Sequence, residues 1–214
     1  LGMFGELFVR GSLVAGGDPG TTASHIAADG LLWRAGMAAD LLMQVMDVPT
    51  IIIFYLLLRP VDHALALMST AFNLVQTAVL ALNKLALMTP LLVAGYVSHP
   101  GGFTAEQLNS LSYLAIQLHS YGFAIGLIFF GFTCLIRGYL LYRSSYFPAP
   151  LGILLALAGA SYLINSFALI VAPKLAQGLF PFILMPAFVG ELSLALWLLI
   201  KGVNLPKWQQ KVAA

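Results

Sequence analysis

The chain has 214 residues, of which 60% are hydrophobic and 8% are charged, and its mean hydropathy is +0.93. Soluble domains carry about 25% charged residues, so this composition excludes a soluble globular protein and indicates a membrane protein. The formal net charge of +2 comes from a few Lys and Arg residues at helix ends, which gives no support for a nucleic-acid partner. Because a membrane crossing takes about 20 residues, the length suits a single transmembrane helical domain, residues 1–214.

The chain begins with a short apolar segment followed by a polar one. Residues 1–9 are too few to cross a bilayer, so we predict that they end a first helix that is truncated in this chain. Residues 10–24 carry the Gly, Pro and Asp residues typical of a loop. Together with the apolar segments that follow, this predicts an all-α integral membrane bundle of six transmembrane helices.

The segment Leu31–Leu58 is long enough to span a membrane but carries polar side chains inside it. Asp40, Gln44 and Asp47 follow each other at helical spacing, so they share one face of a helix. A charge within a transmembrane helix costs about 2.5 to 3.5 kcal/mol on insertion scales and normally faces a partner or a water-filled cavity. We therefore expect this face to point into the bundle, with a kink at Pro49.

Two longer helices are expected next. Residues 64–97 exceed the length that a bilayer requires, so we expect this segment to be tilted, or broken near residues 84–90. After a polar turn, Thr104 and Gln107 match a capping box, which predicts a helix over residues 104–143.

The last part of the chain predicts two more crossings, at residues 150–172 and 182–200, joined by a turn at 173–181. A basic tail follows residue 200. Small residues spaced four apart favour close packing between helices. They occur at Gly122 and Gly126, and at Gly152, Ala156 and Ala160.

The Lys and Arg residues are unevenly divided between the two ends of the predicted helices. Arg10 and Lys174 lie at one set of ends. The other set carries Arg59, Arg137, Arg143, Lys201, Lys207 and Lys211. Because cytoplasmic ends carry the excess of positive charge, we predict that the C-terminus is cytoplasmic.

Three segments carry a resemblance to a known family: GGDPGTTASHIAADGLLWRAGMAADLLMQV, LHSYGFAIGLIFFGF and GYLLYRSSYFPAPLGILLALAGASYLINSF. They resemble the bacterial multi-pass membrane family named domain of unknown function 4386, and the similarity covers nearly the whole chain. The resemblance implies a six-helix architecture in the bacterial inner (cytoplasmic) membrane. It implies no activity, cofactor or catalytic residue.

Depth within the membrane sorts the polar residues into two layers when about 1.5 Å is counted per residue from the cytoplasmic helix ends. The middle layer holds Gln44, Asp47, Asn73, Gln76, Ser161, Asn165 and Glu191. The outer layer holds Asp40, Asn83, Lys84, His119 and Tyr121. The inner third holds none, which predicts a polar pocket open to the outside and sealed by aliphatic packing on the cytoplasmic side.

Charge balance distinguishes two pairs in these layers. Asp40 and Lys84 lie at similar depth and are predicted to form an ion pair. Asp47 and Glu191 share a depth without a basic residue near it, which favours protonation of at least one carboxyl. In one interpretation the two acids share a proton or hold a cation. In the other, each acid only forms hydrogen bonds between helices. Both interpretations remain open.

The candidate ligand- or ion-binding residues come from both layers. They are Asp40, Gln44, Asp47, Asn73, Gln76, Lys84, His119, Asn165 and Glu191. Another set has side chains that can bind a metal: His25, Asp29, His99, Glu106 and His119. No spacing fixes the mutual geometry of this second set, so no metal is assigned. No motif of a known enzyme class occurs, so the cofactor, the catalytic residues and the question of enzymatic activity stay open.

The sequence therefore favours a protein that binds or transports a small ligand, a proton or a cation at an intramembrane polar site. One alternative is an accessory subunit of a larger membrane complex that binds lipid or pigment. Another is an intramembrane enzyme that acts on a lipid or isoprenoid with one of the acids as general acid or base. The expected partners are membrane lipid and another membrane protein or a second copy of the chain, with no nucleic acid.

Overall fold

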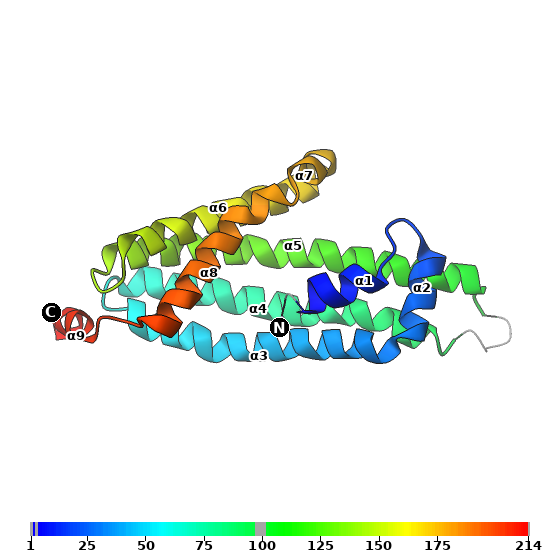
Figure 1. The fold of residues 1–214 in the computed structure, drawn as a ribbon, viewed down its shortest axis with the longest axis horizontal. Coiled ribbons are helices and arrows are strands. Elements are labelled where there is room, and N and C mark those ends of the chain that lie inside the picture. The colour runs from blue at the N-terminus through cyan, green and yellow to red at the C-terminus, as the bar shows by residue number, and fades with distance from the viewer. Residues whose placement is uncertain (1, 3, 97–101, 214) are drawn as a thin grey trace. The chain divides into compact units, whose positions relative to one another are not determined.

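The structure, a computed structural model, describes residues 2, 4–96 and 102–213. The regular elements in these ranges are helices, as Figure 1 shows. Five of the described helices are long and apolar enough to cross a membrane. The prediction of an all-α membrane bundle is therefore confirmed, and the sixth crossing stays a prediction.

The chain forms two compact units. The first unit contains Leu1–Asp47 and Ala78–Phe123, and the second contains Val48–Thr77 and Ala124–Ala214. The prediction of one domain is not decided by this division. Three long helices continue from one unit into the other along the chain: α3 (Gly30–Leu58), α4 (His63–Val93) and α5 (Ala105–Arg143).

Pro49 and Pro90 lie inside α3 and α4, and both helices continue past them. The alternative of a break near residues 84–90 is therefore wrong. The predicted capping box is confirmed, because Thr104 Oγ1 accepts the Gln107 backbone N–H at 3.2 Å while Gln107 Oε1 accepts the Thr104 N–H at 2.9 Å.

The first unit begins with three short elements: a π-helical turn η1 (Phe4–Arg10), α1 (Gly11–Leu13) and α2 (Pro19–Ala28). The predicted loop over residues 10–24 is wrong for most of its length. Asp18 caps α2 by accepting the Thr21 side-chain O–H at 2.6 Å and the Thr21 N–H at 2.9 Å, which holds the Asp18 pKa below its usual range. The Asp-Pro pair that suggested a turn is in fact a helix start, with Pro19 at the first helical position.

The second unit contains α6 (Ala149–Val171), α7 (Pro173–Leu179), the 3₁₀ turn η2 (Phe182–Leu184), α8 (Met185–Ile200) and α9 (Leu205–Ala213). The prediction that residues 173–181 turn the chain is confirmed, and most of this segment is the short helix α7. Helices α6 and α8 pack side by side (Figure 1). The predicted tail after residue 200 includes α9.

Small residues bring α5 and α6 together in the second unit. A Cβ atom added at Gly152 would lie 2.5 Å from the Gly138 carbonyl oxygen and 2.5 Å from the Tyr142 backbone nitrogen. Gly131 on α5 and Gly159 on α6 approach each other in the same way, with the Gly159 oxygen 3.0 Å from the added Cβ. The prediction of close packing at Gly152 is confirmed, and the two glycines of α5 that meet α6, Gly131 and Gly138, lie seven residues apart.

Candidate functional site

A buried ion cluster joins four segments of the first unit. The Oδ2 atom of Asp40, on α3, forms ion pairs with two side chains. Arg10 Nη1 lies 2.8 Å from it, and Lys84 Nζ, from α4, lies 3.0 Å from it. Lys84 Nζ also lies 3.1 Å from Nε2 of His119 on α5. The predicted Asp40–Lys84 ion pair is confirmed, and His119 lies beside it as the common depth of these residues predicted. We call Arg10, Asp40, Lys84 and His119 the ion cluster.

The ion cluster is shielded from solvent. Arg10 is 7% exposed, Lys84 3%, His119 2% and Asp40 1%. Glu6 adds a second carboxylate at the edge, where its Oε2 atom pairs with Arg10 Nη2 at 2.7 Å. With His119 neutral, two cations face two carboxylates, so the group as a whole is neutral and its burial is physically reasonable.

The backbone around the cluster brings these side chains together. Gly5 in η1 lies directly against the Asp40 carboxyl, where a Cβ atom would clash with Oδ1. Asn83 donates to the His119 carbonyl oxygen at 2.8 Å and thereby ties α4 to α5. Gly122 lies against the Asn83 side chain, so a larger residue there would separate the two helices.

Gln44 lies one helical turn from Asp40 on the same face of α3 and is 3% exposed. Neither its amide nitrogen nor its amide oxygen has a hydrogen-bond partner among the described residues. A buried polar group left in this way costs about 1 to 3 kcal/mol, so native proteins usually supply it with a water or another polar group. Gln44 is therefore a member of the predicted set that has hydrogen-bonding capacity to offer a solute.

A hydrophobic layer separates the ion cluster from a cavity in the same unit. The layer consists of Trp33 and Met37 on α3, Leu87 on α4 and Ile116 on α5, all buried in one apolar core. Trp33 Nε1 donates to the Leu87 carbonyl oxygen at 2.9 Å, which joins α3 to α4 within the layer. Each of the three helices passes from the layer to an ion-cluster residue within three positions, about 4.5 Å of rise.

The cavity on the other side of this layer has a volume of about 530 Å³. Its lining includes Ile26 of α2, Arg34 of α3, Leu91 of α4 and Ser112 of α5. Along α4 and α5 the order is therefore cavity, hydrophobic layer and ion cluster, and along α3 the layer residue Met37 lies between the cavity residue Arg34 and Asp40. The volume falls in the range of about 300 to 1,000 Å³ that is typical of small-molecule sites.

The second unit holds a separate polar network. Asn73 Nδ2 donates to Gln76 Oε1 at 2.7 Å, and Arg137 Nη2 donates to Asn73 Oδ1 at 2.8 Å. The Arg137 guanidinium carbon lies 4.2 Å from the centre of the Phe54 ring. Two predictions are wrong here: Arg137 is buried rather than at a helix end, and a layer predicted to lack basic residues contains a cation.

The remaining predicted residues lie at separate places. Glu191 on α8 accepts the Tyr162 phenol O–H on Oε1 at 2.6 Å. Asn165 is half-buried on α6, and no side-chain hydrogen bond joins it to these groups in the part of the chain that the structure describes. Asp47 belongs to the first unit and Glu191 to the second, so their predicted common site stays a prediction.

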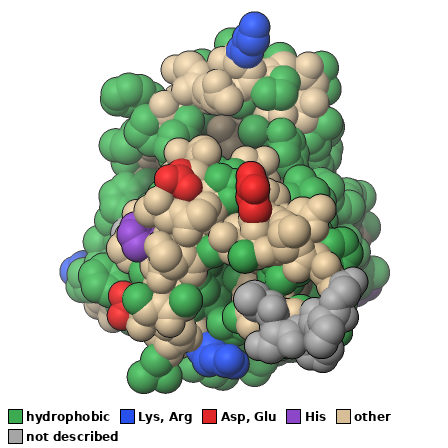
Figure 2. Space-filling model, turned by 90° about the vertical axis from the view of Figure 1, so that its right-hand side faces the viewer, with side chains coloured by type: hydrophobic (Ala, Val, Ile, Leu, Met, Phe, Trp, Pro, Cys, Tyr) green, Lys and Arg blue, Asp and Glu red, His purple; other side chains and the backbone are tan. Residues whose placement is uncertain are grey.

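The residues considered for a metal are not gathered in one place. His119 is buried beside the Lys84 ammonium, whereas Glu106 is exposed at the start of α5. Figure 2 looks onto the end of the molecule where α2 and the start of α5 lie in Figure 1, and its few acidic and histidine side chains are separated by other residues, many of them hydrophobic. Within the described residues no three His, Cys, Asp or Glu side chains lie close enough to hold a metal, and His99 lies outside those residues.

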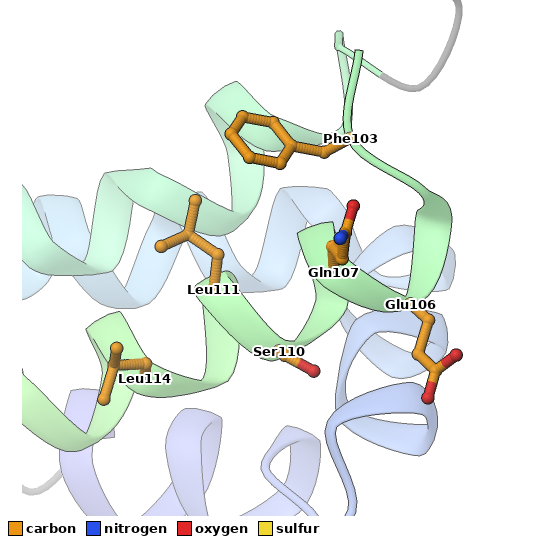
Figure 3. A pocket seen from close by; sticks show the side chains of 6 residues that line it. All are labelled: Phe103, Glu106, Gln107, Ser110, Leu111 and Leu114. Atoms are coloured by element: carbon orange, nitrogen blue, oxygen red, sulfur yellow. The ribbon is translucent and has the colours of Figure 1, made fainter. Parts of the chain in front are cut away.

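Glu106 instead borders a surface pocket of about 490 Å³ on the first turns of α5. Figure 3 shows Leu111 pointing toward Phe103, while the Glu106 side chain points away from both. This pocket is an apolar depression with a polar edge and brings no further ionisable side chain to Glu106.

Comparison with known proteins places the chain in a family. The sequence profile described as "Domain of unknown function (DUF4386)" matches residues 1–202. The chain belongs to this family. An uncharacterized protein of Archaeoglobus fulgidus is 28% identical over 166 residues, which cover 77% of this chain and 82% of that protein. No solved structure matches the chain.

In this DUF4386 member the sequence interpretation missed Glu6 and Arg10 as part of the site. Glu6 was assigned to the end of an apolar helix and Arg10 to a loop. An acid followed four residues later by a base can form an ion pair on one face of a helix. This spacing of Glu6 and Arg10 was the feature of the sequence from which their pairing could have been predicted. Membership of the family supports a multi-pass membrane protein and assigns no activity to this cluster.

Proposed function

We propose that the protein binds or transports a small polar solute at the ion cluster, with a preference for anions and with proton uptake linked to binding. The observation that carries this proposal is the position of Lys84 Nζ, which bridges a carboxylate and an imidazole inside the bundle. Intramembrane ionisable residues are expensive to bury and typically belong to solute or proton pathways.

The charges around Asp40 favour an anion over a cation. A cation that approached Asp40 would meet Arg10 and Lys84 on the same oxygen, and two like charges 4 Å apart repel by about 4 kcal/mol at an effective dielectric constant of 20. A solute carboxylate or similar group can instead replace Asp40 as the partner of one of these cations. Gln44 offers two N–H donors one turn away.

The contact between Lys84 and His119 supplies the link to protons. Protonation of both nitrogens would place two positive charges 3.1 Å apart, so in the neutral cluster one of them accepts the hydrogen bond. An added anion removes this restriction, because a second proton on the Lys84–His119 contact then restores neutrality. Glu6, Arg10 and Asp40 are the other charged groups that face this contact.

The cavity gives the proposed site a route. A solute would enter the cavity beside Arg34 and reach the ion cluster when Trp33 and Leu87 separate. The hydrophobic layer between the cavity and the ion cluster is only about one helical turn thick. We propose that the cavity opens to the outside of the inner membrane and that the C-terminus is cytoplasmic. The exposed cations Arg59, Arg143, Lys201, Lys207 and Lys211 support this orientation.

A cysteine-labelling experiment tests whether the site opens. In a Cys134→Ala background, Gln44→Cys is expected to react with a small anionic thiosulfonate, and to react faster with it than with a cationic reagent of similar size. Reaction requires an open state, because position 44 is buried behind the hydrophobic layer, and Arg10 and Lys84 favour the anion. The measurement is the labelling rate in intact vesicles.

Two matched positions control this experiment. Asn109→Cys, at a half-buried position that lines the cavity, should react at once, whereas Leu140→Cys in the packed core of the second unit, 0% exposed, should stay unreactive. If Gln44→Cys is as inert as Leu140→Cys, the ion cluster is a static connection between helices and the proposal is wrong.

We propose Glu191 and Asp47, the two acids predicted from the sequence, as a second candidate for proton binding. Glu191→Gln is expected to leave the unfolding temperature nearly unchanged, because a Gln oxygen can still accept the Tyr162 O–H. The same substitution should remove an infrared band of a protonated carboxyl that persists above about pH 6, well beyond the ordinary Glu range. A spectrum without such a band, or one unchanged by Glu191→Gln, would leave Glu191 as a hydrogen-bonding residue only.

A further inference from the structure

A polar cavity of about 460 Å³ lies in the second unit, where the chain turns between its membrane-spanning helices. Its lining includes Ser145 and Tyr146 from the α5–α6 connection, Lys201 after α8, and Asn204 and Lys207 at the start of α9. A neighbouring hollow of about 290 Å³ shares Ser145 and Lys207 and adds Lys211. Neither the ion cluster nor the acids discussed above belong to this place.

The ends of three candidate membrane spans define the depth of this cavity. Helix α5 ends at Arg143, α6 begins at Ala149 and α8 ends at Ile200, and the cavity is lined by residues that lie directly beyond these ends. Residues just outside a span lie at the level of the lipid headgroups. The cavity therefore faces the region where lipid phosphates are concentrated.

Helix α9 is held over this cavity by defined contacts. Asn204 Oδ1 accepts the Lys207 N–H at 3.2 Å and so caps the helix, and Trp208 Nε1 donates to the Leu57 carbonyl oxygen at 3.3 Å. With Trp208 fixed, Lys207 and Lys211 lie one turn apart on the same side of α9. Both ammonium groups are thus presented to the cavity and the adjoining hollow.

The lining is chemically suited to an anion. Lys201, Lys207 and Lys211 are exposed, and the residues that line the two hollows include no acid. Burial raises the pKa of Tyr146 to about 12, so its phenol stays neutral near pH 7, and it donates to the Leu57 carbonyl oxygen at 2.5 Å. No negative group among these lining residues opposes a phosphate.

We propose that this cavity is a binding site for the headgroup of an anionic phospholipid, with its phosphate held by Lys201, Lys207 and Lys211. A lipid is favoured over a free phosphate because the surface next to Lys201 is strongly apolar. Leu199 is 82% exposed and Ile200 is 73% exposed, so acyl chains can lie against the end of α8 while the headgroup occupies the cavity.

Competition between lipids tests this site. The full chain is purified in detergent with equal amounts of phosphatidylglycerol and phosphatidylcholine, and the retained lipids are counted by native mass spectrometry. Phosphatidylglycerol should be retained in clear excess. Each Lys→Gln substitution should weaken its retention about five-fold, and the double variant Lys207→Gln/Lys211→Gln about 25-fold, because each Lys near an anionic surface contributes a similar amount.

Lys174→Gln on α7 is the matched control, since it removes the same charge from an exposed position at the other end of α6. It should leave lipid retention unchanged. Equal retention of both lipids, or an equal loss in Lys174→Gln, would overturn the proposal in favour of general charge attraction. Retention of soluble glycerol phosphate with the same lysine dependence, and without a preference between the lipids, would overturn it in favour of a soluble anion.

Discussion

Asp40→Asn is expected to destabilise the protein by about 3 to 5 kcal/mol, the cost of removing one partner from a buried ion pair. The substitution leaves Arg10 and Lys84 facing each other across an uncharged amide at a place where Asp40 itself is 1% exposed. Thermal unfolding in detergent measures the effect. Asp29→Asn, at an exposed position after α2, should change the unfolding temperature little.

A double-mutant cycle separates the ion pair from the cost of each substitution. Lys84→Met alone should also destabilise, while Asp40→Asn together with Lys84→Met should be less destabilised than the sum of the two single variants. The reason is that the double variant removes one cation and one anion, so the ion cluster keeps its neutral balance through Glu6 and Arg10. Additive effects would contradict a direct interaction between Asp40 and Lys84.

Glu6, at the edge of the ion cluster, provides a comparison with Asp40. Its side chain is 46% exposed, so its pair with Arg10 is screened by solvent. We expect a loss below about 1 kcal/mol for Glu6→Gln, as for other exposed ion pairs. Such a contrast with Asp40→Asn would show that burial, rather than the number of ion pairs, decides which carboxylate matters for stability.

The ion cluster was partly predictable because depth can be counted along apolar helices. Asp40, Lys84 and His119 lie in separate helices at similar predicted depth, and all three meet in the first unit. The sequence placed Arg10 in a loop at a helix end, and this is wrong, because Arg10 is buried in η1 and pairs with Asp40. Its contact with Asp40 depends on Gly5, which lets the N-terminal segment approach α3.

Arg137 shows a different limit of the sequence. Counting from Arg143 placed it near a helix end, where a long cationic side chain normally reaches the interface. Its position is instead set by two partners in other parts of α3 and α4, the Phe54 ring and the Asn73 amide oxygen. Such tertiary partners leave no local pattern around Arg137.

The contact between α5 and α6 was predictable from one side only. Gly152 belongs to a small-residue pattern with Ala156, and Gly138 is the backbone that it meets. Helix start signals were similarly ambiguous at α7, where Pro173 begins a helix although proline also favours turns. The spacing of small residues therefore predicts which face of a helix packs closely. Which helix that face contacts depends on how the helices are paired and does not follow from the spacing.

Gly152→Ala is expected to destabilise the second unit, although alanine favours a helix over glycine by about 0.8 to 1 kcal/mol. The added Cβ would lie 2.5 Å from two backbone atoms of α5, the Gly138 oxygen and the Tyr142 nitrogen. Backbone cannot rotate away as a side chain can, so α6 must move and the packing along the interface is lost. Overpacking of this kind costs about 1 to 3 kcal/mol, which exceeds the gain in helix propensity.

Gly178→Ala on α7 is the matched substitution, because a Cβ atom there meets no atom within 4 Å. We expect it to leave the unfolding temperature unchanged or to raise it slightly, the opposite sign to Gly152→Ala. Gly138→Ala should repeat the effect of Gly152→Ala, since its added Cβ would lie 2.6 Å from the Gly152 oxygen. Equal unfolding temperatures for Gly152→Ala and Gly178→Ala would show that α5 and α6 do not depend on this close approach.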